Sequence, residues 1–363
     1  MVRVAINGYG RIGRMAHRVI IESFSNEVEV VAINAGSSTD LKGWMYLLQF
    51  DSVYGPLDVQ NLAVKTPEEA PFSFQTQSPY LGMLSVNGKD IPIFSEKDPN
   101  NLPWKDLNVD VVIESTGAFT TQEKMQPHLT AGAKAAILSS PFKDEESGAT
   151  YVLGVNLDKT TSLSENLISN ASCTTNCITP VARIIQDAFG IEKAMMTTIH
   201  GYTSDQRLQD GGHSDYRRAR AAGLNIIPTS TGATKAAAKA IPELKGIFNG
   251  LALRVPVPVG SLSDFTFLIK KETTVEEVNQ VLTKASEEER YSGILAVTKD
   301  PIVSSDIVGD SHSSIVDLSL TQVVGGNMVK IIAWYDNDYG YSNRLVEEAI
   351  ILGKKSQTPQ SAT

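Results

Sequence analysis

Two cysteines and one histidine are the residues of this sequence best suited to covalent chemistry. The cysteines, Cys173 and Cys177, stand in the run Ser-Cys-Thr-Thr-Asn-Cys. Two thiols cannot build a disulfide framework, and two sulfurs without suitably spaced histidines make a poor zinc site. We therefore expect a reactive thiol, a buried structural thiol or one of each, and no bound metal.

A helix over residues 173–189 would separate the two thiols. Apolar residues recur there at three- and four-residue steps, and Gly190 can end the helix. Cys173 would lie in the first turn, where the positive end of the helix dipole lowers the pKa of a thiol. Cys177, one turn later, would point toward the apolar face. The two thiols should therefore behave differently.

His200 is the candidate proton acceptor. It follows the apolar strand expected at 194–199 and precedes Gly201-Tyr202-Thr203, so its ring would face a cleft at a domain edge. An imidazole beside a thiol can take the thiol proton. Taken singly, a buried cysteine or a histidine at a strand end is more often inert than catalytic.

A Gly-rich turn near the first residue predicts a dinucleotide site. An apolar run at 2–7 leads into Gly8, Gly10 and Gly13 and a helical pattern, and 28–34 supplies a second strand. In such a βαβ unit the glycines permit a tight turn, close approach of the backbone to a pyrophosphate, and close packing of helix on strand.

The residues after the second strand bear on which nucleotide is bound. An NAD-binding domain has an acidic residue there to hold the ribose hydroxyls, but this chain has Asn34-Ala35-Gly36-Ser37-Ser38. Without a carboxylate a 2′-phosphate is not repelled, and the serines offer hydroxyls and amides at an expected helix N-terminus. The sequence therefore favours NADP over NAD, although no arginine stands beside Ala35.

The order of the expected elements indicates two domains. Buried strands at 109–115 and 135–140, with a helical stretch between them, extend the first pattern into an α/β domain with a mostly parallel sheet. Later strands, with helices set apart, are typical of an α+β domain carrying a mixed or antiparallel sheet. The later elements are strands at 194–199, 250–257, 264–269 and 328–335, a helix at 275–289 and a closing helix at 345–352.

We accordingly expect a Rossmann dinucleotide-binding domain at 1–172, completed by the C-terminal helix within 339–363. A catalytic and tetramerisation domain would occupy 173–338. The stretch 66–80 is expected to be a surface loop because it is rich in proline and polar residues.

Composition limits the classes of function. The chain has 363 residues, 42% of them hydrophobic and 20% charged, which suits an ordinary globular protein of two domains. Its net charge of -9 argues against general affinity for nucleic acid or an anionic membrane. No apolar stretch is long enough to cross a bilayer, and Met1 leads straight into an apolar strand pattern, so a cytoplasmic location is expected.

Several long segments resemble the phosphorylating glyceraldehyde-3-phosphate dehydrogenases of the NADP-accepting type. The run Ala171-Ser-Cys-Thr-Thr-Asn-Cys-Ile178 is similar to the active-site signature of that family, and the similarity extends along nearly the whole chain. Supporting segments are 6–14, 114–117, 196–200, 217–222, 228–233 and 334–337.

The resemblance implies a covalent route with two anion sites. Cys173 would add to the aldehyde of glyceraldehyde 3-phosphate, and His200 would move protons during hydride transfer. Inorganic phosphate would then release the thioester as 1,3-bisphosphoglycerate. The substrate phosphate would be held by Thr203 and Arg254, the incoming phosphate by Ser172, Thr231, Gly232 and Arg218, and Thr174 would reach either one.

On the nucleotide side, the resemblance implies roles for five further residues. Arg11 and Ile12 would lie at the pyrophosphate, Lys97 and Ser139 beside the cofactor, and Asn337 at the nicotinamide amide.

Two departures from many relatives carry meaning. Gly211-Gly212 before His213 resembles the small residues of NADP-accepting members, in agreement with the missing acid at Ala35. The stretch 66–83 is longer than is usual, and its role is open. The family is tetrameric, so the resemblance implies a homotetramer with the arginine loop 217–220 at a subunit interface.

Two alternatives stay open. One is an erythrose-4-phosphate dehydrogenase, a relative that hydrolyses its thioester, although the intact Thr203 and the Thr231-Gly232 pair weigh against it. The other is a catalytically silent scaffold or RNA-binding member, suggested by the arginine loop.

Overall fold

The computed structural model describes the whole chain except residues 75, 145–147, 159–162 and 358–363. It divides into two compact units. The first comprises Met1–Thr150, Lys159–Asn170 and Ser342–Thr363, and the second comprises Tyr151–Asp158 and Ala171–Tyr341.

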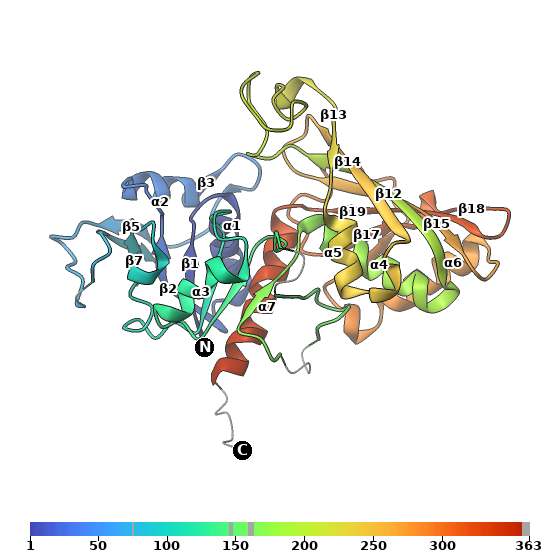
Figure 1. Cartoon of the computed structure of the whole chain (residues 1–363). Helices are drawn as coiled ribbons and strands as arrows, with labels where there is room; N and C mark the ends of the chain where they lie inside the picture. Colours follow the sequence, from blue (N-terminus) through green and yellow to red (C-terminus); the bar gives the residue numbers. More distant parts are fainter. Residues whose placement is uncertain (75, 145–147, 159–162, 358–363) are drawn as a thin grey trace, which may run out of the picture. The chain divides into compact units, whose positions relative to one another are not determined.

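The first unit is built on a largely parallel sheet (Figure 1). Within its described residues the sheet has nine strands in the order β10-β11-β9-β8-β1-β2-β7-β6-β5. All neighbours from β10 to β7 pair in parallel, whereas β6 and β5 are antiparallel additions at one edge. The strands are β1 (Val2–Asn7), β2 (Val28–Asn34), β5 (Leu62–Lys65), β6 (Tyr80–Val86), β7 (Lys89–Phe94), β8 (Val111–Glu114), β9 (Ala135–Leu138), β10 (Ala149–Thr150) and β11 (Leu167–Ser169). The expected Rossmann arrangement is confirmed, with β1 and β2 at the predicted bounds.

Helices connect these strands. One core of the unit gathers around Trp104, Phe94 and Met125, all fully buried. α7 continues from the second unit into the first, where Gly353 lies so close to Val2 that an added Cβ would come within 2.1 Å of its side chain. The other elements are α1 (Arg11–Val19), the π-helix η1 (Ile20–Phe24), α2 (Leu41–Gln49), β3 (Phe50–Asp51), β4 (Gly55–Pro56), the 3₁₀ turn η2 (Pro99–Asn101), α3 (Gln122–Thr130) and α7 (Tyr339–Gln357).

The long connection between β5 and β6 is fastened by aromatic contacts. Phe72 lies 5.2 Å from Phe94 and 5.3 Å from Tyr80, measured between ring centroids. The Tyr80 hydroxyl donates to the Ala70 carbonyl at 2.6 Å. The predicted loop is therefore attached to the end of β7 at Phe94, and the predicted range ends one residue late because Tyr80 begins β6.

The second unit has a mixed sheet, mostly antiparallel, as predicted. Its described strands run in the order β13-β14-β12-β15-β19-β17-β16, with β18 paired to β19. Only β12–β14 and β16–β17 pair in parallel among these neighbours. The strands are β12 (Ile191–Gly201), β13 (Ile227–Ser230), β14 (Phe248–Val255), β15 (Ser261–Ile269), β16 (Leu295–Thr298), β17 (Ser314–Asp317), β18 (Gln322–Val324) and β19 (Met328–Tyr335).

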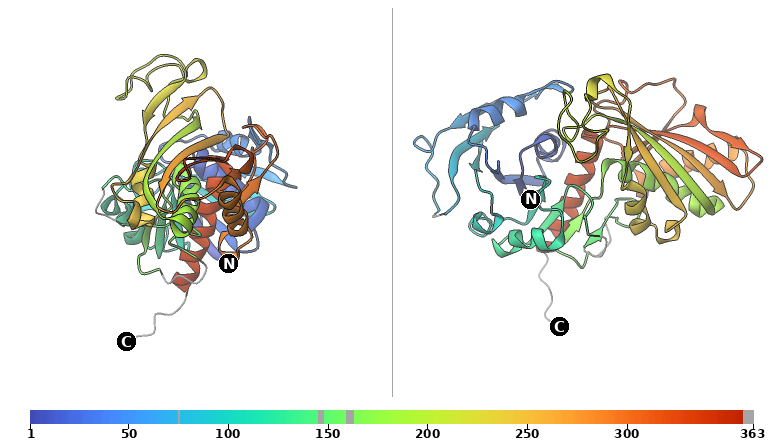
Figure 2. Two further views of the ribbon diagram at one scale, coloured as in Figure 1. Left: turned by 90° about the vertical axis from the view of Figure 1, so that its right-hand side faces the viewer. Right: turned by 45° about the horizontal axis from the view of Figure 1, so that its top comes forward.

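Three helices pack against this sheet (Figure 1). α4 contacts β12, β15, β17 and β19 as well as α5 and α6. The segment 202–226 loops outward near β13, as the views in Figure 2 also show. The helices are α4 (Cys173–Phe189), α5 (Ala233–Ala240) and α6 (Val275–Ser286), and the 3₁₀ turns are η3 (Ala222–Leu224), η4 (Pro242–Leu244), η5 (Glu289–Tyr291) and η6 (Leu318–Leu320).

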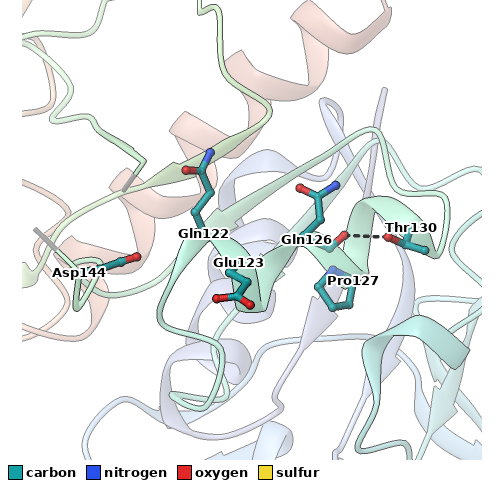
Figure 3. A pocket seen from close by; sticks show the side chains of 6 residues that line it. All are labelled: Gln122, Glu123, Gln126, Pro127, Thr130 and Asp144. Carbon is teal, nitrogen blue, oxygen red and sulfur yellow. Dashed lines mark hydrogen bonds between the residues drawn. The ribbon is translucent and has the colours of Figure 1, made fainter. Parts of the chain in front are cut away.

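A pocket in the first unit lies along α3 (Figure 3). Most of its lining residues carry polar side chains, and the Thr130 hydroxyl donates to the Gln126 carbonyl at 3.3 Å. The lining residues are Gln122, Glu123, Gln126, Pro127, Thr130 and Asp144, and none of them is a predicted site residue. Among the described residues, no helix is both long and apolar enough to cross a membrane.

Candidate active site

The first turn of α4 presents Cys173. Ser172 is the N-cap residue of the helix, and its hydroxyl accepts a hydrogen bond from the Thr175 N–H at 3.1 Å. Ala171, just before the cap, is fully buried and has a φ of 52°, a conformation that non-glycine residues seldom adopt. This turn fixes where the helix starts, and Gly190 ends it with a φ of 69°.

The structure brings Cys173 and His200 together. The Sγ atom of Cys173 lies 3.3 Å from Nε2 of His200, which is the penultimate residue of β12. β12 pairs in parallel with β14, and the register sets His200 opposite Arg254. A thiol, an imidazole and a guanidinium are thus grouped in one place.

Two partners compete for the other ring nitrogen of His200. Nδ1 lies 2.6 Å from the carbonyl oxygen of Gly201 and 2.7 Å from Nη1 of Arg254. The carbonyl can only accept, which requires a proton on Nδ1, whereas the guanidinium can only donate, which requires a lone pair there. The position of the imidazole proton therefore depends on Arg254.

Tyr335, at the end of β19, is a site residue that the sequence did not indicate. Its hydroxyl is 2.9 Å from Oγ1 of Thr174 and 2.7 Å from Oγ1 of Thr198, so it joins the first turn of α4 to β12. Its ring meets that of His200 edge-on at 6.0 Å. The Thr174 hydroxyl, predicted to reach a phosphate, is buried in this contact.

Burial dominates the electrostatics of both thiols. It raises the pKa of Cys173 to about 11, although the charge of Arg254 and hydrogen bonds from Thr174 lower it. It raises the pKa of Cys177 to about 12. The predicted lowering of the Cys173 pKa was wrong, because desolvation outweighs the charge of Arg254 and the hydrogen bonds from Thr174. The predicted difference between the thiols holds, since Cys177 lies wholly in the core and Cys173 is only partly buried.

His200 is favoured in its neutral form. Burial and the adjacent Arg254 charge lower the pKa of His200 to about 3. A neutral imidazole is the form that can take a proton from a thiol or a hydroxyl.

Some of the residues predicted to bind phosphate already form hydrogen bonds or ion pairs within the protein. Arg218 donates to Oγ1 of Thr229 at 2.9 Å and forms a 2.7 Å salt bridge with Asp205. Gly232 is the N-cap residue of α5, and the Thr231 hydroxyl accepts from the N–H of Ala233 at 3.2 Å. Asp205, in the loop 202–226, is an acid at this site that the sequence patterns did not indicate.

Two further predicted residues have well-defined surroundings. The backbone N–H of Thr203 donates to Gln206 at 3.3 Å. Oδ1 of Asn337 accepts from the Ser261 hydroxyl at 2.8 Å, and that hydroxyl accepts from the N–H of Gly201 at 3.2 Å. The amide of Asn337 is therefore tied to the residue that follows His200.

The Gly-rich turn has the local shape that a pyrophosphate needs. A Cβ added to Gly8 would lie 2.6 Å from the backbone N of Thr116, and one added to Gly13 would lie 2.1 Å from the carbonyl oxygen of Gly8. A Cβ added to Gly10 would meet nothing within 4 Å. Gly10 is the N-cap residue of α1, which has no side-chain cap, so an anion can approach the helix N–H groups there.

The loop after β2 differs from the prediction. α2 begins at Leu41, and its N-cap residue is Asp40, whose carboxylate accepts from the N–H of Gly43 at 2.8 Å. A helix does begin just after Ser37 and Ser38, as predicted, but the residue that caps it is Asp40 and neither serine does. The Ser38 hydroxyl instead accepts from the Trp44 indole at 3.0 Å.

The other predicted nucleotide residues lie at the carboxyl edge of the sheet or on α1. The Arg11 guanidinium is paired with Asp51 and lies over the ring of Tyr54, so the backbone of Arg11 is what faces the turn. Ile12 follows it in the first turn of α1. The N–H of Lys97 donates to the Glu96 carboxylate at 2.7 Å, and the N–H of Ser139 donates to the Glu114 carbonyl at 2.9 Å.

Comparison with known proteins identifies the family. Residues 2–122 match the model of the glyceraldehyde 3-phosphate dehydrogenase NAD binding domain, and residues 172–337 match the C-terminal domain of the same family. The chain belongs to the glyceraldehyde 3-phosphate dehydrogenase family.

Full-length relatives agree with this glyceraldehyde 3-phosphate dehydrogenase assignment. The chain is 47% identical over 354 residues to glyceraldehyde-3-phosphate dehydrogenase 2 of Streptomyces avermitilis, covering 98% of this chain and 99% of the relative. It is 49% identical over 358 residues to the glyceraldehyde-3-phosphate dehydrogenase of Mycobacterium avium, with 97% and 99% covered. The Geobacillus stearothermophilus enzyme is 47% identical over 354 residues, with 98% and 99% covered. The protein is thus an enzyme of the NAD(P)-dependent dehydrogenase class.

Proposed function

We propose that this protein oxidises glyceraldehyde 3-phosphate to 1,3-bisphosphoglycerate through a thioester on Cys173. Cys173 adds to the aldehyde carbon, and its proton passes through Nε2 of His200 to the carbonyl oxygen. His200 then takes the proton of the resulting hydroxyl as the thioester forms, and the hydride on the same carbon would pass to the bound nucleotide. Attack by inorganic phosphate breaks the carbon–sulfur bond and returns the thiolate of Cys173.

The observation that carries this proposal is the 3.3 Å separation of Cys173 Sγ and His200 Nε2, beside Arg254. A neutral imidazole at that distance can accept the thiol proton, and a nearby guanidinium stabilises the thiolate and suits a phosphate group. Thr203 and Arg254 would hold the substrate phosphate. Ser172, Thr231, Gly232 and Arg218 would hold the incoming phosphate.

The nucleotide supplies the hydride acceptor. The open space at Gly10 and the uncapped start of α1 fit its pyrophosphate. We assign Gly8, Gly10, Arg11, Ile12 and Gly13 to that group. We assign the remaining predicted positions to the rest of the nucleotide: Asn34, Ala35, Ser37, Ser38, Lys97, Ser139 and Asn337.

NADP is the nucleotide that we propose, with NAD as a second acceptor. Support comes from Ala35, which directly follows β2 and brings no carboxylate to the place where NAD enzymes hold the ribose. Asp40 at the start of α2 acts in the opposite direction, because its carboxylate already occupies that helix terminus. A substitution at Ala35 tests which of these two effects decides the nucleotide preference. Ala35→Asp should raise the KM for NADP about ten-fold or more and leave the KM for NAD within about two-fold, and an unchanged preference would refute the role of Ala35.

The function is tested by assaying reduction of NADP and NAD with glyceraldehyde 3-phosphate, with and without inorganic phosphate. We expect turnover that depends on phosphate. Equal turnover without phosphate would favour the erythrose-4-phosphate dehydrogenase alternative, and no turnover at all would favour a silent scaffold or RNA-binding member.

We further propose a homotetramer in the cytoplasm. The loop 202–226 exposes large apolar side chains, with Leu208 90% exposed, Tyr216 87% and Leu224 84%, which suits a surface covered by another subunit. Cys173 and Cys177 are both free thiols, and a thiol nucleophile needs a reducing compartment. Sedimentation of a monomer at micromolar concentration would contradict the tetramer.

A further inference from the structure

A buried hydrogen-bond network crosses the carboxyl edge of the first unit's sheet. Its five members are Trp104, His128, Glu114, Asn7 and Asn34, and each is at most 2% exposed. Glu114 ends β8, Asn7 ends β1 and Asn34 ends β2, and these strands are neighbours in the sheet. We call these five residues the Glu114 network.

One end of the network fixes the proton of His128. The Trp104 indole can only donate, and its Nε1 lies 3.2 Å from Nδ1 of His128. Nδ1 must therefore carry a lone pair, so a neutral imidazole has its proton on Nε2. That nitrogen lies 3.0 Å from Oε2 of Glu114 and donates to it.

The other end of the network fixes the orientations of the side-chain amides of Asn34 and Asn7. Asn34 is held by the backbone of Glu96, whose N–H donates to Oδ1 at 2.9 Å and whose carbonyl accepts from Nδ2 at 2.9 Å. Nδ2 of Asn34 also donates to Oδ1 of Asn7 at 2.7 Å. This contact turns Nδ2 of Asn7 toward Oε2 of Glu114, at 2.5 Å.

Both chains of donors therefore converge on one carboxylate. The second oxygen of Glu114 accepts from the N–H of Thr116 at 2.8 Å and from its hydroxyl at 2.5 Å. A side chain that accepts at both oxygens satisfies all four of these donors. Fully satisfied buried networks of this kind hold their surroundings rigidly.

The Glu114 network holds the loops on which the nucleotide residues stand. The Ser115 hydroxyl donates to the Gly8 carbonyl at 2.7 Å, and Gly8 rests against Thr116 without room for a Cβ. Asn34 precedes Ala35, and Glu96 precedes Lys97. Ligands of doubly wound sheets bind at this carboxyl edge.

We propose that Glu114 is the positioning residue of the nucleotide site. It is the acceptor that locks the Gly-rich turn and the loops after β2 and β7 into the geometry that binds NADP or NAD. This inference rests on the proposed function, since it requires the nucleotide to bind at this edge. Glu114 itself need not touch the nucleotide.

Glu114→Gln tests the proposal with little change of shape. The new NH₂ group opposes either the Thr116 N–H or the donors from Asn7 and His128, so at least one donor loses its partner whichever way the amide turns. We expect the Kd of NADP and NAD, measured by titration calorimetry, to rise about ten-fold or more. The nucleotide-free alkylation rate of Cys173 should stay within about two-fold of wild type, because an effect confined to the nucleotide edge leaves the thiol untouched.

Asp110→Asn is the matched control. Asp110 is also 2% exposed and directly precedes β8, at the opposite end of the strand from Glu114. Its carboxylate accepts from the Arg3 N–H at 2.9 Å and from Lys134 at 2.7 Å. This variant should lower the melting temperature but leave the nucleotide Kd within about two-fold. An equal rise in Kd for both variants, or a loss of stability alone in Glu114→Gln, overturns the proposal.

Two substitutions of His128 test the proposal if the Glu114→Gln variant does not fold. His128→Gln can still donate to Glu114, whereas His128→Leu cannot, so the leucine variant should have the higher nucleotide Kd by about three-fold or more. Equal Kd values overturn the proposal. Failure of the wild-type protein to bind either nucleotide would instead refute the proposed function.

Discussion

Each unit buries a histidine within a hydrogen-bond network, and the two histidines differ in what sets their protons. At His128 a donor-only indole and an acceptor-only carboxylate leave a single tautomer of the neutral ring. At His200 a carbonyl and a guanidinium make opposite demands on one nitrogen. A fixed proton suits a group that holds other residues in place. A proton that two neighbours would place differently suits a group that must give it up and take it back.

The two sites also differ in charge. Glu114 brings a carboxylate that accepts four hydrogen bonds, so the Glu114 network is satisfied by residues of the first unit. At Cys173 the charge of the cation Arg254 has a larger effect than the opposing charge of Asp338, and Arg218 lies within electrostatic range of Arg254. The thiol site is therefore arranged to accept negative charge, whether on sulfur or on a phosphate group.

The same substitution in both units gives the largest contrast. His200→Gln should lower kcat about 100-fold or more, because the base that moves the thiol and hydroxyl protons is lost. His128→Gln should leave kcat within about two-fold, because glutamine can still donate to Glu114. Steady-state kinetics on both variants checks this, and similar kcat values for the two would break the distinction between a moving and a fixed proton.

A smaller effect is expected from Arg254→Gln on the ionisation of Cys173. The guanidinium lowers the pKa of this thiol, so its removal should move the pH of half-maximal alkylation upward by about one unit. The sign follows because the thiolate forms as the pH rises, and without the cation it forms later. Iodoacetamide labelling across pH, with peptide mapping of Cys173, measures the shift.

Arg183→Gln is the control for that experiment. Arg183 lies on α4, the helix that begins at Cys173, but it forms a salt bridge with Asp187 on the helix surface. Its loss should leave the labelling profile of Cys173 unchanged. An equal shift in both variants would show that Arg254 acts only through general charge.

The smallest expected effect concerns the acid that competes for Arg218. Asp205→Asn removes the 2.7 Å salt bridge, so the guanidinium becomes more available and the KM for inorganic phosphate should fall about two- to three-fold. Asp210→Asn is the matched change on the same loop, because Asp210 pairs with Arg220. A KM that rises in Asp205→Asn would mean that Asp205 orients Arg218 toward the phosphate.

Local patterns predicted the parts of the site that depend on neighbours in sequence. The strand bounds of β1 and β2, the start of α4 at Cys173 and its end at Gly190 all follow from periodicity and turn residues. Contacts set by sheet register were beyond such patterns. His200 and Arg254 are 54 residues apart and meet only because β12 and β14 pair in one register.

Networks between distant segments were the least predictable. Tyr335 reaches Thr174 across 161 residues, and Asn7 reaches Glu114 across 107. The predicted pKa shift of Cys173 was wrong because burial, which no local pattern reveals, exceeds the effects of Arg254 and Thr174 that lower the pKa. Likewise, Asp40 and not the serines before it proved to cap α2, since several residues in that run are good caps and the fold selects one.

The covalent role of Cys173 can be measured directly by trapping the acylated enzyme. The protein is mixed with glyceraldehyde 3-phosphate and NADP in the absence of inorganic phosphate, quenched in acid, and examined by intact-mass and peptide mass spectrometry. The account predicts one 3-phosphoglyceroyl group per chain, attached at residue 173 and released on adding phosphate before the quench. Nucleotide reduction without any adduct, or an adduct on Cys177, would contradict it.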